Sequence, residues 1–223
     1  MTEVWLGIET TTPTGGAALI KNGILLTEEF FPIRATHSEK VLPGISRLIK
    51  QADLNPKEIT GIAVSAGPGS YTGLRIGIAT TLGLSAGWGV GAVCVDTLRV
   101  LAASVTADYP VLSCIKARSN EVFAAVYESS SFEARTIIVP GVYVASALER
   151  RVAELDTVIA VGSGKHEMSF SGNVKVTDPL WDIPRPSLVA LLGSAKAESH
   201  GFDDHPAPVY LRGFNEKADS VVL

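Results

Sequence analysis

The same opening pattern, three predicted strands in succession, occurs twice in this 223-residue chain and limits its fold more than any other feature. In the first half, Asn22-Gly23 separates two apolar runs, and this dipeptide is a strong hairpin signal. Helices and strands alternate after each three-strand opening. Such an order describes an α/β sheet of mixed strand direction, and its recurrence predicts an internal duplication.

Apolar periodicity and turn residues give the expected element boundaries. Strands of the first half are expected at Val4–Glu9, Gly16–Ile20, Ile24–Phe30, Ile59–Ser65 and Val90–Val95. Those of the second half are expected at Val111–Ile115, Glu121–Tyr127, Thr136–Val139 and Val158–Val161. Later helices are predicted at Tyr71–Ala86, Ala145–Glu154 and Leu188–Glu198. We expect two domains, 1–106 and 107–223, and leave open whether the last helix packs back on the first.

The first helix carries its own start and stop signals. Thr36 and Glu39 have the spacing of a capping box, in which each side chain satisfies a backbone N–H at the helix start. Pro43 lies inside the helix and is expected to bend its first turns. Asn55-Pro56 is expected to end it.

Composition excludes several classes of protein. Apolar residues make up 46% of the chain and charged residues 19%, which excludes intrinsic disorder. A net charge of −4 supplies no surface to neutralise phosphates, so autonomous tight binding of nucleic acid is not expected. Two cysteines, Cys94 and Cys114, cannot build a disulfide framework, and the first residues lack a secretory pattern. The expected compartment is the cytoplasm.

A run of twenty residues without charge, Ile76–Val95, has the length of a membrane span. It contains five glycines, and Gly87-Trp-Gly-Val-Gly91 is typical of a helix end followed by a new strand. We therefore expect a buried helix and a buried strand here, with no membrane association.

Three glycine- or threonine-rich turns are candidates for contact with a phosphate. The densest, Gly67–Gly77, follows a strand and opens a helix, where free N–H groups favour an anion. The alternative is close helix packing through Gly73, Gly77 and Gly83. A second turn contains Gly162 and Gly164 but lacks the residues of a P-loop. A third, Thr10-Thr11-Thr12, offers hydroxyls and amides, although strand-forming threonines explain it almost as well.

No catalytic set is evident. The four histidines have no metal-binding spacing, and the sequence lacks the glycine-flanked serine of a nucleophile elbow. Both cysteines lie in expected buried strands, where a thiol is unreactive. The sequence therefore predicts neither a metal site nor a catalytic residue.

The string Ser65-Ala-Gly-Pro-Gly-Ser-Tyr-Thr-Gly-Leu-Arg-Ile-Gly77 closely resembles the signature of the TsaB (YeaZ) family. Further pieces fit the same family: Leu6-Gly-Ile-Glu-Thr-Thr11, His37-Ser-Glu39 with Leu42-Pro43, and Pro208-Val-Tyr-Leu-Arg212. The resemblance covers essentially the whole chain. It implies the actin-like ATPase (ASKHA, ribonuclease H-like) fold, built as two duplicated α/β lobes.

The resemblance also implies a function. TsaB looks like a shortened, inactive relative of TsaD, which transfers threonylcarbamoyl to adenosine beside the tRNA anticodon; the ATPase TsaE joins them. The expected role is thus a non-catalytic subunit that meets tRNA only within the complex. No cofactor is expected to be required, and weak binding of ATP or ADP through Thr10, Thr11, Thr12, Gly162 and Gly164 is left open.

Family partners dock on the two helices of the first lobe, which here carry Leu42, Ile45, Ile49, Leu74, Ile78 and Leu82. Which of the six face the partner is left open, as is a homodimer of the free chain. The alternative function is an independent ASKHA-type kinase or ATPase. Glu9 ends the first strand of the first half, whereas Lys116-Ala-Arg118 occupies the comparable turn of the second. Replacing a carboxylate by a cation removes a magnesium ligand, which disfavours that alternative.

Overall fold

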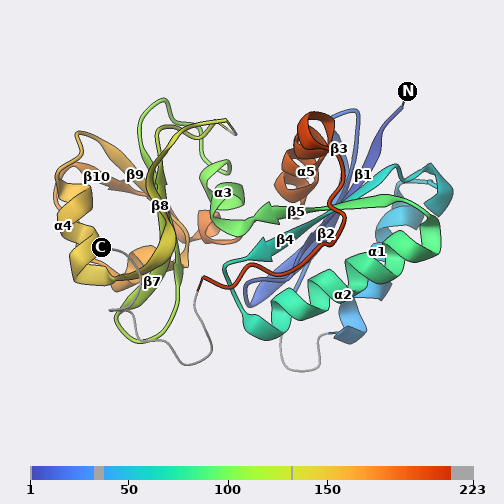
Figure 1. Cartoon of the computed structure of the whole chain (residues 1–223), viewed down its shortest axis with the longest axis horizontal. Helices are drawn as coiled ribbons and strands as arrows, with labels where there is room; N and C mark the ends of the chain where they lie inside the picture. Colours follow the sequence, from blue (N-terminus) through green and yellow to red (C-terminus); the bar gives the residue numbers. More distant parts are fainter. Residues whose placement is uncertain (1, 33–37, 132, 212–223) are drawn as a thin grey trace. The chain divides into compact units, whose positions relative to one another are not determined.

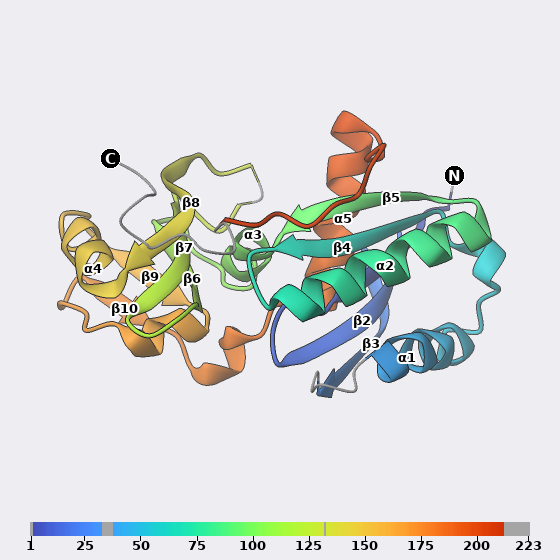
Figure 2. The ribbon, with the colours of Figure 1, turned by 60° about the horizontal axis from the view of Figure 1, so that its bottom comes forward.

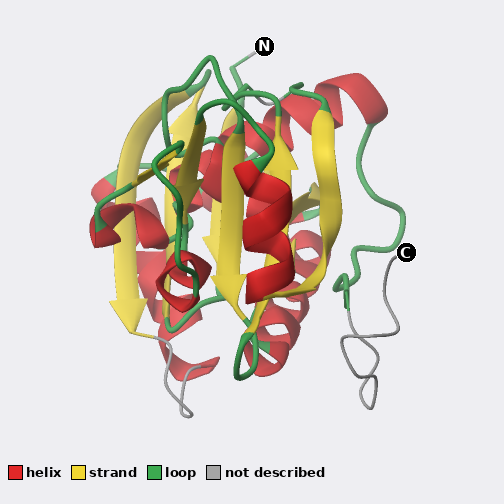
Figure 3. Ribbon diagram, turned by 90° about the vertical axis from the view of Figure 1, so that its left-hand side faces the viewer, coloured by secondary structure: helices red, strands yellow, loops and turns green. Residues whose placement is uncertain are grey.

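A computed structural model describes residues 2–32, 38–131 and 133–211. Contacts divide the chain into two compact units, of which the first comprises Met1–Val100 and Pro184–Val209 and the second contains Leu101–Ile183. The Thr36–Glu39 capping signal and His37 fall outside the part whose side chains are described. The described part of the chain contains both helices and strands, as expected for an α/β protein (Figure 3).

The first unit contains a five-stranded sheet with the strand order β3-β2-β1-β4-β5. Its elements are β1 (Val4–Glu9), β2 (Thr14–Lys21), β3 (Ile24–Pro32), α1 (Ser38–Gln51), the 3₁₀ helix η1 (Pro56–Glu58), β4 (Gly61–Gly67), α2 (Tyr71–Trp88) and β5 (Gly91–Asp96). Strands β1, β2 and β3 are antiparallel neighbours, whereas β4 and β5 run parallel to β1. The predicted mixed sheet is confirmed, and Asn22 and Gly23 form the hairpin turn with positive φ.

Helices cover both faces of this sheet (Figure 1). Helices α1 and α2 lie on one face, and α5 (Pro186–His200) lies on the other, against β1, β2 and β4. Central strands β1 and β4 are buried at every position, because a strand covered on both faces has no side exposed to water. Their apolar runs are therefore continuous rather than alternating.

Helix α5 approaches the sheet unusually closely. A Cβ atom at Gly7 would lie 2.1 Å from the carbonyl oxygen of Pro186, and one at Gly193 would lie 2.2 Å from the Cβ of Ala63. Glycine is required at both contacts, since no real Cβ atom approaches so near. This helix follows the second unit in sequence but packs in the first.

After α5 the chain runs in extended form along β5 and over the end of β4 (Figure 2). The Asp203 N–H donates to the carbonyl of Ala92, and the Asp203 carboxylate accepts the N–H of Cys94 at 2.6 Å. Lys196 Nζ completes the contact by donating to Asp203 and to the carbonyl of Cys94. The outer edge of β5 is thereby covered, which removes a template for unwanted strand pairing.

The second unit repeats the topology, with the strand order β10-β9-β6-β7-β8. Its elements are β6 (Val111–Lys116), β7 (Glu121–Tyr127), β8 (Thr136–Val144), α4 (Ala145–Ala153), β9 (Val158–Val161), η2 (Ser163–Glu167), β10 (Val174–Val176) and η3 (Pro179–Asp182). The predicted duplication is confirmed, because the order matches that of the first sheet strand for strand. Between β9 and β10, however, the five-residue η2 stands where the first unit has the 18-residue α2.

Several boundaries differ from the predicted ones. Helix α1 ends at Gln51, before Asn55, which caps η1 instead. Strand β4 begins at Gly61 rather than Ile59, and β8 extends to Val144 rather than Val139. Short elements α3 (Thr97–Ala102) and β10 carry too few residues to show a period, and the sequence prediction missed both.

The charge-free run is divided as expected. Helix α2 ends at Trp88, Gly89 adopts the left-handed conformation that closes it, and β5 follows. Within the described ranges, the structure has no helix that is both long and apolar enough to span a bilayer.

Candidate functional site

Glu9, at the end of β1, is fully buried and turned inward. One carboxylate oxygen, Oε1, accepts the N–H and the hydroxyl of Thr11, both at 2.5 Å. The other, Oε2, receives no hydrogen bond from the described residues, although Ser65 lies beside Glu9 on the neighbouring strand β4. Burial raises the pKa of Glu9 to about 6, because it disfavours the charged form more than the nearby Ser65 hydroxyl and the hydrogen bonds from Thr11 stabilise it.

The three threonines that follow Glu9 are buried, and their hydroxyl protons are all engaged within the chain. Thr10 Oγ1 donates to the carbonyl of Gly73, Thr11 Oγ1 to Glu9, and Thr12 Oγ1 to the carbonyl of Thr14. Contact of these residues with a nucleotide stays a prediction. In this structure their hydroxyl protons are already used within the chain.

The glycines of the signature string let α2 lie directly on this threonine turn. A Cβ atom at Gly73 would lie 1.9 Å from the Thr10 carbonyl oxygen, and one at Gly77 would lie 2.4 Å from Thr10 Oγ1. At Gly69, a Cβ would lie 2.5 Å from the carbonyl oxygen of Thr11. The packing interpretation is thus correct for Gly73 and Gly77. It is wrong for Gly83, which has no neighbour within 4 Å.

The second glycine turn packs in the same manner. Gly162 has φ +99°, and a Cβ there would lie 2.1 Å from the carbonyl oxygen of Cys114; Gly164 lies against the same residue. Lys165 is buried and forms an ion pair with Asp182. Asp182 also contacts His166 Nε2 at 2.7 Å. The lysine that follows the glycines is therefore held by a carboxylate within the unit, and a nucleotide role for Gly162 and Gly164 stays a prediction.

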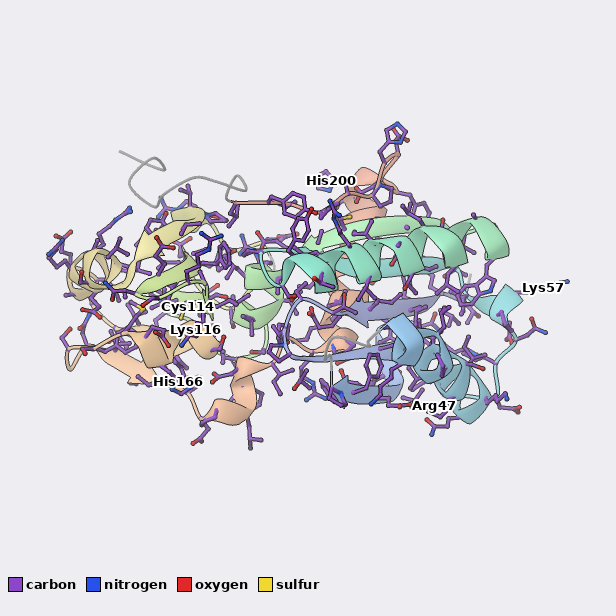
Figure 4. The ribbon with its side chains drawn as sticks, turned by 90° about the horizontal axis from the view of Figure 1, so that it is seen from below. Arg47, Lys57, Cys114, Lys116, His166 and His200 are labelled. Carbon is purple, nitrogen blue, oxygen red and sulfur yellow. The ribbon has the colours of Figure 1, made fainter. Side chains whose placement is uncertain are left out.

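Glu9 and Lys116 occupy equivalent positions, because each ends the first strand of a sheet with the same topology. Lys116 Nζ pairs with Glu167 at 2.5 Å, on the side of the second unit where Figure 4 also shows His166. One position thus carries a buried carboxylate and the other a cation. The alternative kinase hypothesis expects a carboxylate at each of these strand ends, and only the first unit has one.

Neither cysteine is activated as a nucleophile in this structure. Burial raises the pKa of Cys94 to about 11 and that of Cys114 to about 12, so neither thiol is ionised at neutral pH. Within the described ranges, no group of three or more histidine, cysteine, aspartate or glutamate side chains is arranged to hold a metal ion.

The six predicted contact residues divide into two sets. Four are buried in the core of the first unit: Ile45, Ile49, Leu74 and Ile78. Leu42 and Leu82 are 51% and 44% exposed. Of the six, Leu42 and Leu82 are therefore the two that reach solvent, and contact of any of the six with a partner stays a prediction.

Helices α1 and α2 enclose an apolar groove of about 360 Å³. Leu84 and Trp88 of α2 line it together with Leu42 of α1 and with Pro56. The next residue after Pro56, Lys57, projects away from the ribbon in Figure 4. A second hollow of about 410 Å³ lies along α2 beside Tyr71 and Arg75, whose guanidinium sits 4.3 Å above the Tyr71 ring.

Sequence analysis did not identify Leu84, Trp88 and Tyr71 as residues that line these hollows, although a signal for them was present. Arg75 is the one charged residue among the 18 of α2. A helix that is apolar on all sides is expected to be covered on all sides. Its own sheet covers only one face, so the opposite face of α2 carries unusual apolar exposure for a surface helix.

Comparison with known proteins identifies the family. A family model described as TsaD, tRNA N6-adenosine threonylcarbamoyltransferase, matches residues 32–189, more than half of the chain. The tRNA threonylcarbamoyladenosine biosynthesis protein TsaB of Bacillus subtilis is 28% identical over 221 residues, which cover 93% of each chain. TsaB of Escherichia coli is 31% identical over 126 residues, covering 55% of this chain and 54% of that one.

Solved structures agree with this assignment. YeaZ from Pseudomonas aeruginosa matches with a TM-score of 0.78 and 25% identity, covering 94% of this chain and 100% of that one. Component A of (R)-2-hydroxyglutaryl-CoA dehydratase from Acidaminococcus fermentans matches with a TM-score of 0.51 and 12% identity over 88% of this chain and 99% of that one, a likeness in fold alone. The chain therefore belongs to the family of the tRNA N6-adenosine threonylcarbamoyltransferase model, in its TsaB (YeaZ) branch, and has the duplicated actin-like α/β fold.

Proposed function

We propose that this chain is a non-catalytic subunit required for threonylcarbamoylation of adenosine beside the tRNA anticodon. Two of its relatives are named tRNA threonylcarbamoyladenosine biosynthesis protein, which supports a role in this modification. In this proposal a TsaD-type subunit performs the transfer, a TsaE-type ATPase joins the complex in the cytoplasm, and tRNA is met only within it.

The observation that carries the proposal is the uncovered apolar face of α1 and α2. Leu42 is 51% exposed and borders a groove that Leu84 and Trp88 also line, and Leu82 is 44% exposed on α2 outside the lining of that groove. Exposed apolar side chains of this kind are typical of protein–protein interfaces. We place the TsaD-type partner on this face, and the same face would serve a homodimer of the free chain.

The chemistry of the strand ends supports a subunit without its own catalysis. Glu9 is buried against Thr11, and its counterpart Lys116 is paired with Glu167 and supplies no carboxylate to a divalent cation. No cofactor is required in this proposal, and any affinity for ATP or ADP is weak. An independent kinase or ATPase would instead show magnesium-dependent turnover that is lost in Glu9→Ala.

Leucine-to-aspartate substitutions test the partner surface. Leu42→Asp and Leu82→Asp place a charge in the proposed interface, and each should weaken binding of the TsaD-type subunit at least about tenfold, because a buried unpaired charge is costly. Binding is measured by calorimetry, and modified nucleoside by mass spectrometry after reconstitution with the TsaD-type and TsaE-type proteins.

The matched control is Leu180→Asp, at a leucine in η3 that is 87% exposed and lies outside the helical face. It should bind within about twofold of the unchanged chain, since exposed substitutions away from an interface are nearly neutral. The proposal fails if all three variants bind alike, or if the two other proteins reach full rate without this chain.

A further inference from the structure

The buried carboxylate of Glu9 has no role in the proposed function so far, yet its contacts lead toward the partner-binding helix. Glu9 Oε1 holds Thr11 through two hydrogen bonds, from the backbone N–H and from the side-chain hydroxyl. A single acceptor that binds both groups of one residue fixes the orientation of that residue. The peptide that follows Thr11 is thereby fixed as well.

Thr11 in turn holds the start of α2. Its carbonyl oxygen accepts the N–H of Ser70 at 2.7 Å, and Ser70 is the N-cap of α2, whose hydroxyl accepts the N–H of Gly73. Next to it, Thr10 Oγ1 donates to the carbonyl of Gly73 at 2.8 Å. The first turn of α2 is thus docked on the threonine turn by hydrogen bonds to Thr10 and Thr11.

The docking leaves no room for adjustment. Gly69 and Gly73 meet Thr11 and Thr10 at distances that even one methyl group would violate. A shift of the threonine turn toward α2 would therefore push the helix, and a shift away would open a gap, because packed interiors have few voids. The position of Tyr71 and Arg75, which line the hollow on α2, follows the position of this turn.

The carboxylate acts here as a hydrogen-bond acceptor rather than as one half of an ion pair. Among the described residues, the groups that act on it are the Thr11 amide and the hydroxyls of Thr11 and Ser65, and none is a cation. A neutral side chain of the same shape with one carbonyl oxygen, glutamine, can accept the same two bonds from Thr11.

We propose that Glu9 is a positioning residue for the partner-binding surface: through Thr11 it sets the first turn of α2, and it does so as an acceptor, not as a metal ligand. This inference rests on the proposed function, because it assigns the surface of α2 to the TsaD-type partner. In this proposal Glu9, although buried, contributes to assembly of the complex without touching the partner.

The test compares Glu9→Ala with Glu9→Gln in the full chain. Amide hydrogen exchange of the free protein reports the first turn of α2, and calorimetry reports affinity for the TsaD-type subunit. Glu9→Ala should raise exchange at Tyr71–Arg75 about tenfold more than in β6 and β7, and should weaken partner binding about tenfold, the loss expected for one buried hydrogen-bond acceptor. Glu9→Gln should restore both values.

Thr11→Val serves as a second variant should Glu9→Ala fail to fold, since it removes one of the two donors and keeps the shape; Thr11→Ser is its matched control. The inference is overturned if Glu9→Gln is as impaired as Glu9→Ala, because a metal ligand needs the charge. It is also overturned if exchange rises equally throughout the first unit. Failure of the unchanged chain to bind the partner would instead overturn the proposed function, and the exchange data in the free chain would still decide the role of Glu9.

Discussion

Glu9 ends β1 with its side chain buried, and its environment makes its protonation sensitive to folding. The carboxylate gains two donors from Thr11 but loses its hydration, and the loss of hydration dominates, which places its pKa at about 6 instead of 4.5. The folded chain therefore binds this proton more tightly than the unfolded chain does. Stability then depends on pH in a direction opposite to that of a carboxylate held by a salt bridge.

Glu9→Gln should reveal that dependence. Because the folded pKa is raised, the stability that Glu9 contributes is full below about pH 4.5 and is lost as pH rises through about 6. Glutamine has no proton to lose. The free energy of unfolding of Glu9→Gln, relative to the unchanged chain, should therefore grow by about 2 kcal/mol between pH 4 and pH 7.

Urea unfolding at several pH values measures this difference. Glu3→Gln, at an exposed position near the start of the same strand, controls for the loss of one carboxylate. A difference between Glu9→Gln and the unchanged chain that stays constant over the pH range would show that Glu9 titrates alike in the folded and unfolded states.

At the scale of one element, α2 shows how a single helix serves two surfaces. Gly73 and Gly77 face the threonine turn at distances that exclude a side chain, whereas Gly83 and Gly87 have nothing within 4 Å. Glycine therefore has opposite effects on stability at the two ends of this helix. Near its start glycine is required for packing, and near its end glycine costs helix stability without a contact in the free chain.

Alanine substitutions separate these roles. Gly73→Ala should destabilise the fold by about 1–3 kcal/mol, because its Cβ overlaps the Thr10 carbonyl and forces α2 to move. Gly83→Ala should instead stabilise the fold by up to about 1 kcal/mol, since alanine is the better helix former where space is open. Thermal or urea unfolding gives both values. Equal effects of the two variants would contradict the packing described for Gly73.

At the scale of the whole molecule, the first unit is discontinuous in sequence. Helix α5 comes after the entire second unit, yet it covers one face of β1, β2 and β4 and buries Val189, Ala190 and Leu192 there. The first 100 residues thus contain only part of the structure they need, and the remainder is supplied from beyond residue 183.

Truncation after Ile183 tests this dependence. Without α5, the sheet exposes an apolar face, a loss on the order of 5 kcal/mol that is comparable to the whole stability of a domain. We expect the cooperative unfolding of the first unit to disappear, with increased binding of a hydrophobic dye. A synthetic peptide of residues 184–209, added in trans, should reverse the dye binding in part. A truncated chain that unfolds like the full chain would show that α5 is dispensable.

Local signals determined most of the elements and the family of this protein. The hairpin at Asn22-Gly23, the repeated three-strand opening and the signature string from Ser65 to Gly77 are all contained in neighbouring residues, so the sequence sufficed for the fold class and the TsaB assignment. The family resemblance also indicates α1 and α2 as the partner-binding helices, which stays a prediction. Short elements such as β10 could not be predicted, because three residues are too few to show a hydrophobic period.

Only the tertiary structure decided which side chains remain for a partner. Ile45 and Leu42 are similar in type and neighbours on one helix, but the first packs on the sheet and the second is exposed, because exposure depends on what long-range contacts cover each face. In the same way, Glu9 is the acid on which the alternative kinase hypothesis depends, and only the fold shows that it is buried beside Thr11. The sequence determines which functional groups the chain carries. Contacts between segments far apart in the sequence determine which of these groups are exposed to solvent.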